Sequence, residues 1–322
     1  MQNKSNRIVS VVIVTFGVKD YLNACLDSVK EQTFTQLEII VIDNSLNPNF
    51  NREIKEYHPD IKLYPSPKNL FYCAALNKGI EMSEGDFILC LNDDVTLDKI
   101  FIEEALQGFS LNNKIGIVSG KVLRICGKII DSTGLFLTSW RTAKERGYGI
   151  KDKGQFEKGE LIFGVNGAVA FYRREMLQEI KEGADYFDSD FRMFYEDLDI
   201  SWRAKRFGWQ AWYNPKAIAY HVRGASFRPA EGLDKPYARR YLDDVLHSDL
   251  IKNRYLTIIK NESIHGFIFH LPAIVLYDFV QWVYILFFKP KVVKIFFSNF
   301  GYIKNAFQKI KRQGYPSIKA NY

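Results

Sequence analysis

Short apolar runs alternate with amphipathic segments along the first third of the chain. Runs rich in β-branched residues at 9–15 and 37–42, and shorter apolar runs at 61–64 and 87–91, are typical of strands buried on both faces of a sheet. Segments 21–32, 72–82 and 98–111 carry apolar residues at helical spacing. This rhythm predicts an α/β fold built on a doubly wound parallel sheet flanked by helices.

Polar residues follow these predicted strands where each one ends. Thr15 and Asp43 close the first two runs, and Asp93 and Asp94 follow the fourth. Because the carboxyl ends of parallel strands share one edge of a sheet, we expect these side chains to converge. Paired carboxylates there would suit a divalent cation that also holds phosphates. The alternatives are an ordinary turn after residue 43 and a solvated acidic loop at 93–94.

Two common nucleotide-binding patterns are absent from the sequence. No Gly-x-Gly-x-x-Gly follows the first strand, and there is no Walker Gly-x-x-x-x-Gly-Lys. A dinucleotide or P-loop site is therefore disfavoured. A nucleotide held by side chains and a metal ion fits the pattern better.

The second half of the predicted domain is less regular. We interpret residues 116–160, which are polar and broken by glycines, as a variable loop region, and residues 163–171 as a glycine-flanked strand. Glu196 and Asp197 then open a helix with a buried side. These acids either complement the positive helix end or include a general base that faces a cleft.

Two short strands, at 210–213 and 217–220, lead to His221, and a long helix is predicted over 238–260. A lone histidine is more often a core or surface residue than a ligand, so His221 is a weak candidate by itself. Four cysteines without Cys-x-x-Cys spacing favour a reducing compartment, and the polar segment 1–7 leads straight into a strand without a signal-peptide pattern.

Charge is distributed unevenly along the 322 residues. The net charge is +7, and the segment 289–322 holds eight basic and no acidic residues, so the tail accounts for the positive charge. Residues 267–288 are apolar but interrupted by His270, Pro272, Asp278 and Gln281. Residues 292–310 form one apolar stripe flanked by lysines.

This tail predicts a helix lying in the interface of an anionic membrane. The alternatives are a spanning or re-entrant segment over 267–288 and a soluble partner surface, including a homodimer seam. Nucleic acid is disfavoured as a partner because the basic residues interleave with an unbroken apolar stripe.

The order of these motifs resembles the inverting glycosyltransferases of family 2, which have the GT-A fold. Within that family the chain looks most like the rhamnosyltransferase branch that builds bacterial cell-surface polysaccharides. The resemblance covers residues 9–260 and is carried by segments 11–16, 41–45, 69–71, 77–80, 91–95, 164–168 and 196–199, and by Arg203, His221 and Ser226.

The resemblance implies roles for individual residues. It assigns nucleotide-sugar binding to Thr15, Phe16, Asp43, Asn69, Asn77, Asn92, Asp93 and Gly167. It also implies a Mg²⁺ or Mn²⁺ ion on Asp94 and His221, with Asp197 as catalytic base and Glu196 in positioning or acceptor binding. Asn92 stands where many relatives have Asp, which weakens a role for that position.

The implied enzyme moves a sugar, with rhamnose favoured, from a dTDP-, UDP- or GDP-sugar to a glycan or polyprenyl-linked acceptor. We expect a mostly parallel GT-A domain over 1–232, with a nucleotide-sugar half to 115 and an acceptor half from 116. A helix over 233–262 and a membrane-associating tail over 263–322 would follow, at the cytoplasmic face of a bacterial plasma membrane.

Two other functions remain open at this stage. The alternatives are a catalytically silent nucleotide-sugar-binding or scaffold protein and a nucleotidyltransferase. A processive polymer synthase is disfavoured because no Gln-x-x-Arg-Trp signature occurs. We therefore expect one or a few sugars to be added.

Overall fold

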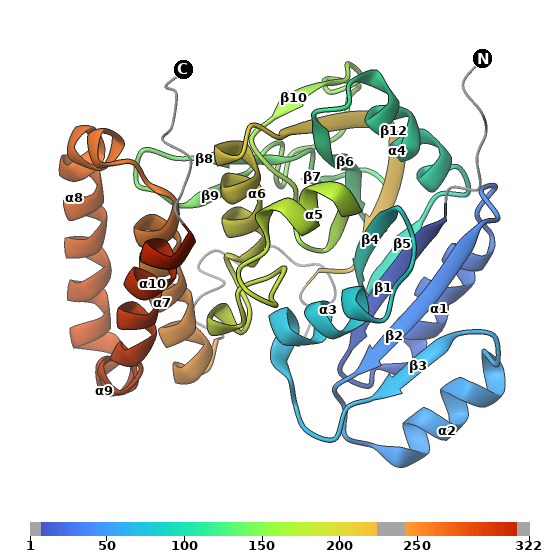
Figure 1. Cartoon of the computed structure of the whole chain (residues 1–322), viewed down its shortest axis with the longest axis horizontal. Helices are drawn as coiled ribbons and strands as arrows, with labels where there is room; N and C mark the ends of the chain where they lie inside the picture. The colour runs from blue at the N-terminus through green and yellow to red at the C-terminus, as the bar shows by residue number, and fades with distance from the viewer. Residues whose placement is uncertain (1–7, 224–241, 314–322) are drawn as a thin grey trace.

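The computed structural model describes residues 8–223 and 242–313, which form a twisted sheet between helices and a bundle of C-terminal helices (Figure 1). The sheet has the strand order β10-β12-β6-β11-β4-β1-β2-β3. Its first parallel block comprises β1 (Val9–Thr15), β2 (Leu37–Asp43), β3 (Lys62–Pro65) and β4 (Phe87–Asn92). The predicted α/β fold with a mostly parallel sheet is thus confirmed.

The second half of the sheet mixes strand directions. Antiparallel β11 (Val169–Arg173) joins β4 to β6 (Ile115–Arg124), and β12 (Gln210–His221) runs parallel to β6. The shorter strands are β5 (Val95–Leu97), β7 (Ile130–Ser132) and β10 (Glu160–Ile162). A separate hairpin consists of β8 (Leu135–Leu137) and β9 (Ala143–Glu145).

Helices cover both faces of the sheet because its strands are apolar on both sides. Along β1, Val11 and Ile13 pack into one core cluster and Val12 and Val14 into the other. The first cluster takes α1 (Lys19–Lys30), α2 (Pro48–Tyr57) and α4 (Phe101–Leu111). The second takes α3 (Phe71–Glu81), α5 (Arg174–Ile180) and α6 (Glu196–Arg206).

Strand register brings the predicted polar residues to one edge. Thr15 pairs with Asp43 across β1 and β2, and the preceding residue of β1 pairs with Asn92. On the other side of β4, Leu91 pairs with the first residue of β11. Because these strand ends are level, the loops that follow them face the same space.

The interpretation of 116–160 as a variable loop region was wrong. All ten residues of β6 are buried at the centre of the sheet. Its run Ile115-Gly116-Ile117-Val118 could have indicated a strand, but the glycines obscured it. The two strands predicted at 210–213 and 217–220 are likewise one strand, β12, with an irregularity between Asn214 and Ile218.

The C-terminal helices pack on the α/β part of the chain through α7 (Asp244–Asn261). The predicted long helix begins at Asp244, and its portion before residue 242 lies outside the described residues. The next helix, α8 (Ile264–Phe288), stands at the outer edge of the bundle, and α9 (Pro290–Ser298) and α10 (Phe300–Gln313) lie toward α7 (Figure 1).

The single amphipathic stripe predicted over 292–310 was wrong in two respects. The helix is interrupted at Asn299, and the part in α9 buries Val292 and Phe296 among α7 and α8 instead of facing outward. The large exposed apolar surface lies on α8, where Phe269, Phe279 and Phe287 are 66–80% exposed. Phe296 of α9 packs inward, where Trp282 and Tyr255 meet it edge to face, whereas the neighbouring Phe297 is 62% exposed.

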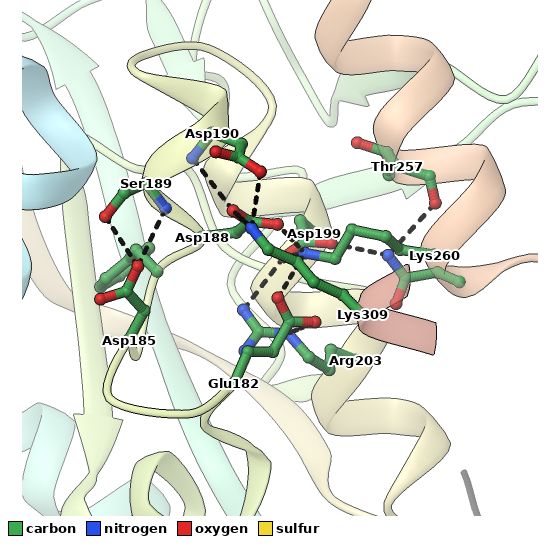
Figure 2. A network of polar contacts seen from close by, with 12 residues as sticks. Glu182, Asp185, Asp188, Ser189, Asp190, Asp199, Arg203, Thr257, Lys260 and Lys309 are labelled. Atoms are coloured by element: carbon green, nitrogen blue, oxygen red, sulfur yellow. Dashed lines mark hydrogen bonds and ion pairs between the residues drawn. The ribbon is translucent and has the colours of Figure 1, made fainter. Parts of the chain in front are cut away.

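A buried ionic network fixes the bundle to α6 and the loop before it (Figure 2). The Nζ atom of Lys260, a fully buried residue of α7, lies 2.7 Å from Asp188, 2.9 Å from Glu182 and 3.1 Å from Asp199. From α10, Lys309 reaches Asp188 at 2.5 Å. Lys309 had been counted with the basic surface of the tail, whereas it serves this network.

Candidate active site

One side of the site is built from the ends of β1, β2 and β4. We call it the donor edge, because the family resemblance assigns binding of the nucleotide-sugar donor to its residues. The hydroxyl of Thr15 donates to Asp93 Oδ2 at 2.7 Å, and the carboxylate of Asp43 accepts from the Ser45 amide at 2.7 Å. Burial raises the pKa of Asp93 to about 6, with a smaller contribution from the charge of Asp94, against the hydrogen bond from Thr15. Three residues far apart in sequence thus form one polar edge.

Asp94 and His221 meet beside this edge. Nε2 of His221 lies 3.3 Å from Asp94 Oδ1, and Nδ1 lies 2.9 Å from Asp131 Oδ2. Burial opposes the charged imidazole, but hydrogen bonds to Asp131 and Asp94 outweigh it and raise the pKa of His221 to about 9. The sequence left His221 weak because its partners come from β7 and from the end of β4.

Asp131 holds this histidine in place. The side chain is fully buried, and its Oδ1 forms ion pairs with Arg124 at 2.7 Å and Arg223 at 2.9 Å. Burial alone would raise the pKa of Asp131, but the hydrogen bond from His221 and the two guanidinium groups lower it to about 2. An anionic carboxylate on Nδ1 directs Nε2 toward Asp94.

Asp94 and His221 offer a donor set that fits a divalent cation. A carboxylate oxygen and an imidazole nitrogen come from adjacent strand ends, and a second carboxylate orients the imidazole, as is usual for metal-ligating histidines. Within residues 8–223 and 242–313 no cluster of three or more acidic, histidine or cysteine side chains could hold a metal. The two side chains therefore suit an ion that completes its coordination with phosphate oxygens and water.

Across the cavity, the first turn of α6 presents two carboxylates. Asp197 Oδ2 accepts from the Gly167 amide at 3.2 Å, and Oδ1 accepts from the Leu198 amide at 2.7 Å. Burial raises the pKa values of both acids, to about 8 for Glu196, where the Asp197 charge adds to the effect. The hydrogen bonds from these two backbone amides favour the anionic form of Asp197, so Glu196 is the acid that stays protonated at neutral pH.

A cavity of about 450 Å³ joins the two sides. His221, Asn92 and Arg223 line it near the donor edge, and Asp197 lines it near α6. Apolar side chains close the remaining walls, contributed by Leu135, Met193, Phe194, Tyr195 and Leu250. The cavity is thus lined by the basic side chains of Arg223 and His221, by the carboxyl groups of Glu145, Glu196 and Asp197, and by apolar side chains.

Glu145 is a cavity residue that the sequence interpretation missed. It ends β9, and its carboxylate accepts from Ser132 and from Asn166. Burial raises the pKa of Glu145 to about 7, against the charge of Arg223. No spacing signal could reveal it, because β9 lies on a hairpin within the supposed loop region.

The predicted sugar-binding residues are placed unevenly. Gly167 lies against the two acids that begin α6: a Cβ there would approach Glu196 Oε1 to 3.2 Å. Phe16 is 36% exposed at the donor edge. Asn69 caps the start of α3 through the Phe71 amide at 2.7 Å, and Asn77 binds the backbone of residues 186 and 187. Neither asparagine lines the cavity, and both bind backbone of segments other than the strand ends that hold Thr15, Asp43 and Asp93.

Sequence comparison decides the family. The family model described as Glycosyl transferase family 2 matches residues 10–181, more than half of the chain. The chain belongs to glycosyl transferase family 2. It is therefore a glycosyltransferase, as the motifs had predicted, and the matched segment contains the donor edge together with Asp131, Glu145 and Gly167.

Curated relatives of this family 2 chain are similar over about two thirds of its length. A poly-beta-1,6-N-acetyl-D-glucosamine synthase of Staphylococcus epidermidis is 24% identical over 221 residues, 66% of this chain and 49% of the relative. A synthase of the same name from Staphylococcus aureus strain MSSA476 is 22% identical over 226 residues. The chain spans about half the length of these relatives. The sequence had set the chain apart from polymer synthases, whereas these relatives carry a synthase name.

A solved structure supports the fold of this family 2 chain. The crystal structure of GalNAc-T7 with UDP, GalNAc and Mn²⁺ superposes with a TM-score of 0.59 at 15% identity, covering 80% of this chain and 48% of that one. The identity is low, so the likeness concerns the fold. It confirms the predicted GT-A architecture.

Proposed function

We propose that this glycosyltransferase transfers a sugar, with inversion, from a nucleoside diphosphate donor to a hydroxyl of a glycan or lipid-linked acceptor used in cell-surface polysaccharide synthesis. The observation that carries the proposal is one cavity lined both by His221 and by Asp197. Nε2 of His221 lies 3.3 Å from Asp94, so a donor held beside this pair and an acceptor beside Asp197 can meet in the cavity.

Residues on each side have separate tasks in the proposed reaction. Asp197 takes the proton of the acceptor hydroxyl, whose oxygen forms a bond to the anomeric carbon as the bond from that carbon to the diphosphate breaks. A Mg²⁺ or Mn²⁺ ion held by Asp94 and His221 would take up charge on the departing diphosphate. No enzyme nucleophile is needed, because a single displacement inverts the anomeric carbon.

Neighbouring acids and cations complete this division of labour. Protonated Glu196 can donate a hydrogen bond to the acceptor, and Glu145 presents a second carboxyl to the same cavity. Thr15, Phe16, Asp43 and Asp93 would hold the nucleotide at the strand ends. The Mn²⁺ named with the GT-A neighbour GalNAc-T7 supports a divalent ion in a fold of this kind.

Two donors have the best claim for the first assay. Rhamnose from dTDP-rhamnose follows from the motif resemblance, and UDP-N-acetylglucosamine follows from the polymer named for the staphylococcal relatives. GDP-sugars complete the panel. We propose dTDP-rhamnose as the donor and one or a few additions per acceptor.

The test is the release of nucleoside diphosphate from this panel with Mn²⁺ or Mg²⁺ and a membrane extract as the source of acceptor. Asp94→Ala is compared with Asp86→Ala, which removes an exposed carboxylate just before the opposite end of the same strand. We expect metal-dependent release from one donor, lost in Asp94→Ala and kept in Asp86→Ala. Equal release by both variants, or no release from any donor, would overturn the proposed mechanism.

We further propose that the enzyme works at a membrane surface through α8. This helix is 25 residues long and, by length and composition, apolar enough to cross a membrane, with 11% of its most apolar window buried. Its polar interruption faces inward: Asp278 pairs with Arg254 of α7 at 2.5 Å. The outward side is apolar and aromatic, which suits a helix seated in the interface of an anionic cytoplasmic leaflet.

Flotation of the full chain with phosphatidylglycerol-containing vesicles tests this surface. Phe269→Asp and Phe287→Asp together should reduce binding, whereas Tyr57→Asp, an exposed aromatic of α2, should not. Flotation that is equal for all variants would refute the assignment. A dimer of the wild type that the α8 changes convert to monomer would instead identify α8 as a seam between two copies.

A further inference from the structure

We infer that Asn253 of α7 is a positioning residue for the catalytic carboxylate, acting through the loop that leads into α6. This inference rests on the proposed role of Asp197 as the general base. Asn253 lies outside the segment matched by the family model. Its helix, α7, also packs against the apolar α8. The Asn253 side chain is fully buried.

The side-chain amide of Asn253 donates hydrogen bonds to three backbone carbonyl oxygens in that loop. Nδ2 donates to the carbonyl oxygens of Phe191 at 2.8 Å, Met193 at 2.7 Å and Phe194 at 2.8 Å. An amide group has two hydrogens, so at least one of them is shared between two carbonyls. The neighbouring Lys252 adds a bond from Nζ to the Asp190 carbonyl at 2.6 Å.

The loop needs such support because its backbone is unusual. Arg192, Phe194 and Tyr195 have φ angles of 64°, 71° and 68°, in the left-handed region that L-residues rarely adopt. Tyr195 is the N-cap of α6 and makes no side-chain capping bond. Nothing in the local sequence favours this conformation, so contacts from other elements must hold it.

The same loop determines where the catalytic acids point. Met193, Phe194 and Tyr195 line the cavity, and Glu196 and Asp197 follow them directly. Asp197 meets the Gly167 amide at 3.2 Å, a contact that a small shift of the helix start would break. Loss of the Asn253 donor removes its three bonds to this loop, although the Phe191 carbonyl still accepts from the Met193 amide, so the loop relaxes and Asp197 moves.

Asn77 shows that the other half of the loop is held in a similar way. From α3, its Oδ1 accepts from the amides of Tyr186 and Phe187 at 3.1 and 2.8 Å. Two asparagines, Asn77 on α3 and the fully buried Asn253 on α7, thus fix the segment from residue 186 to residue 194. Asn253 holds the end nearer to the chemistry.

The test compares Asn253→Ala and Asn253→Asp with Leu256→Ala in the full chain, kept in mild detergent. Leu256 is a buried core residue one turn further along α7, so its truncation destabilises the same helix but leaves the three hydrogen bonds in place. Hydrogen–deuterium exchange of the amides at 192–198 should accelerate by roughly 10-fold or more in the Asn253 variants only. Equal acceleration in Leu256→Ala, or none in Asn253→Ala, would overturn the inference.

Kinetics with the donor found active in the panel give the second readout. The Asn253 variants should lose kcat on the order of 100-fold while the donor KM changes by less than about twofold. An equal loss in Leu256→Ala would reduce Asn253 to a stabilising role. Asp197→Asn in the same assay separates the two ideas. If Asp197→Asn keeps full activity, the proposed base is wrong, whereas exchange still reports on the anchoring of the loop.

Discussion

Replacement of Lys260 by Met tests how strongly the C-terminal bundle is fixed to the catalytic part. The Nζ atom is fully buried and within 3.1 Å of three carboxylates, from Glu182, Asp188 and Asp199 (Figure 2). Burial disfavours the ammonium group, but these three charges outweigh it and raise the pKa of Lys260. Methionine keeps the length of the side chain and removes only the cation.

The expected cost is about 3–5 kcal/mol of unfolding free energy at pH 7, the usual effect of leaving a buried charge without its partner. Arg203 and Lys309 remain near the carboxylates, which places the loss toward the lower end. The cost should shrink as the pH falls from 7 to 5. Burial and the lysines Lys260 and Lys309 act oppositely on Asp188, and the lysines lower its pKa in the wild type. In the wild type, the stability that ionised Asp188 contributes is therefore fully present above the unfolded-state pKa of about 4. The carboxylates of the variant, with raised pKa values, take up protons in that window and relieve their repulsion.

Urea unfolding at fixed detergent concentration, followed by the fluorescence of the five tryptophans, measures this free energy. Lys294→Met on α9 is the matched control, since that side chain is exposed and its loss should cost under about 0.5 kcal/mol. A loss in Lys260→Met below about 1 kcal/mol, or one that grows on acidification, would refute the reasoning.

Three further predictions concern the active site. The rate should fall in acid as Asp197 becomes protonated and fall again above pH 8 as Glu196 ionises, and Glu196→Gln should remove the alkaline limb of a kcat–pH profile. Asp131→Asn should weaken Mn²⁺ binding by about 10- to 100-fold, measured by electron paramagnetic resonance, because His221 loses the anion on Nδ1; unchanged affinity would contradict the role of this histidine. Gly167→Ala should lower kcat by roughly 10-fold with little change in melting temperature, because the added methyl meets Glu196 Oε1 at 3.2 Å; a wild-type kcat would show that the acids can move aside freely.

The donor edge could be predicted from the sequence because its signals are local. A β-branched run predicts a buried strand, and the topology of a parallel sheet then brings Thr15, Asp43 and Asp93 together without further information. The start of α6 was predicted for a similar reason, since its apolar spacing continues over three turns.

The remainder of the site depends on partners that the local pattern does not reveal. Asp131 and Glu145 lie on strands of three residues, which are too short to show a periodic pattern. Their place in the site is evident only from their partners in space, His221 and Arg223 for Asp131 and Asn166 for Glu145. The motif residue Ser226 lies outside the described residues.

The tail was misjudged because hydrophobic periodicity gives the face of a helix but not what covers it. The stripe over 292–310 predicts an amphipathic helix equally well for a membrane and for a bundle. The break at Asn299 and the contact of Phe296 with Trp282 place the α9 part of the stripe in the bundle, whereas Phe300 and Phe307 of α10 are each 54% exposed. Asp278, taken as a cost for a membrane segment, is a partner for Arg254 on α7.

The attachment of α7 to the loop before α6 has a practical consequence for anyone who wants this enzyme without detergent. Removing the apolar end of the chain would also remove Lys309 from the ionic network and uncover Ile251 and Tyr255, which pack against α8 and α9. Shortened proteins should therefore express poorly or lose activity. Water solubility is better engineered by replacing the exposed aromatic residues of α8 with polar ones, which leaves every helix in place.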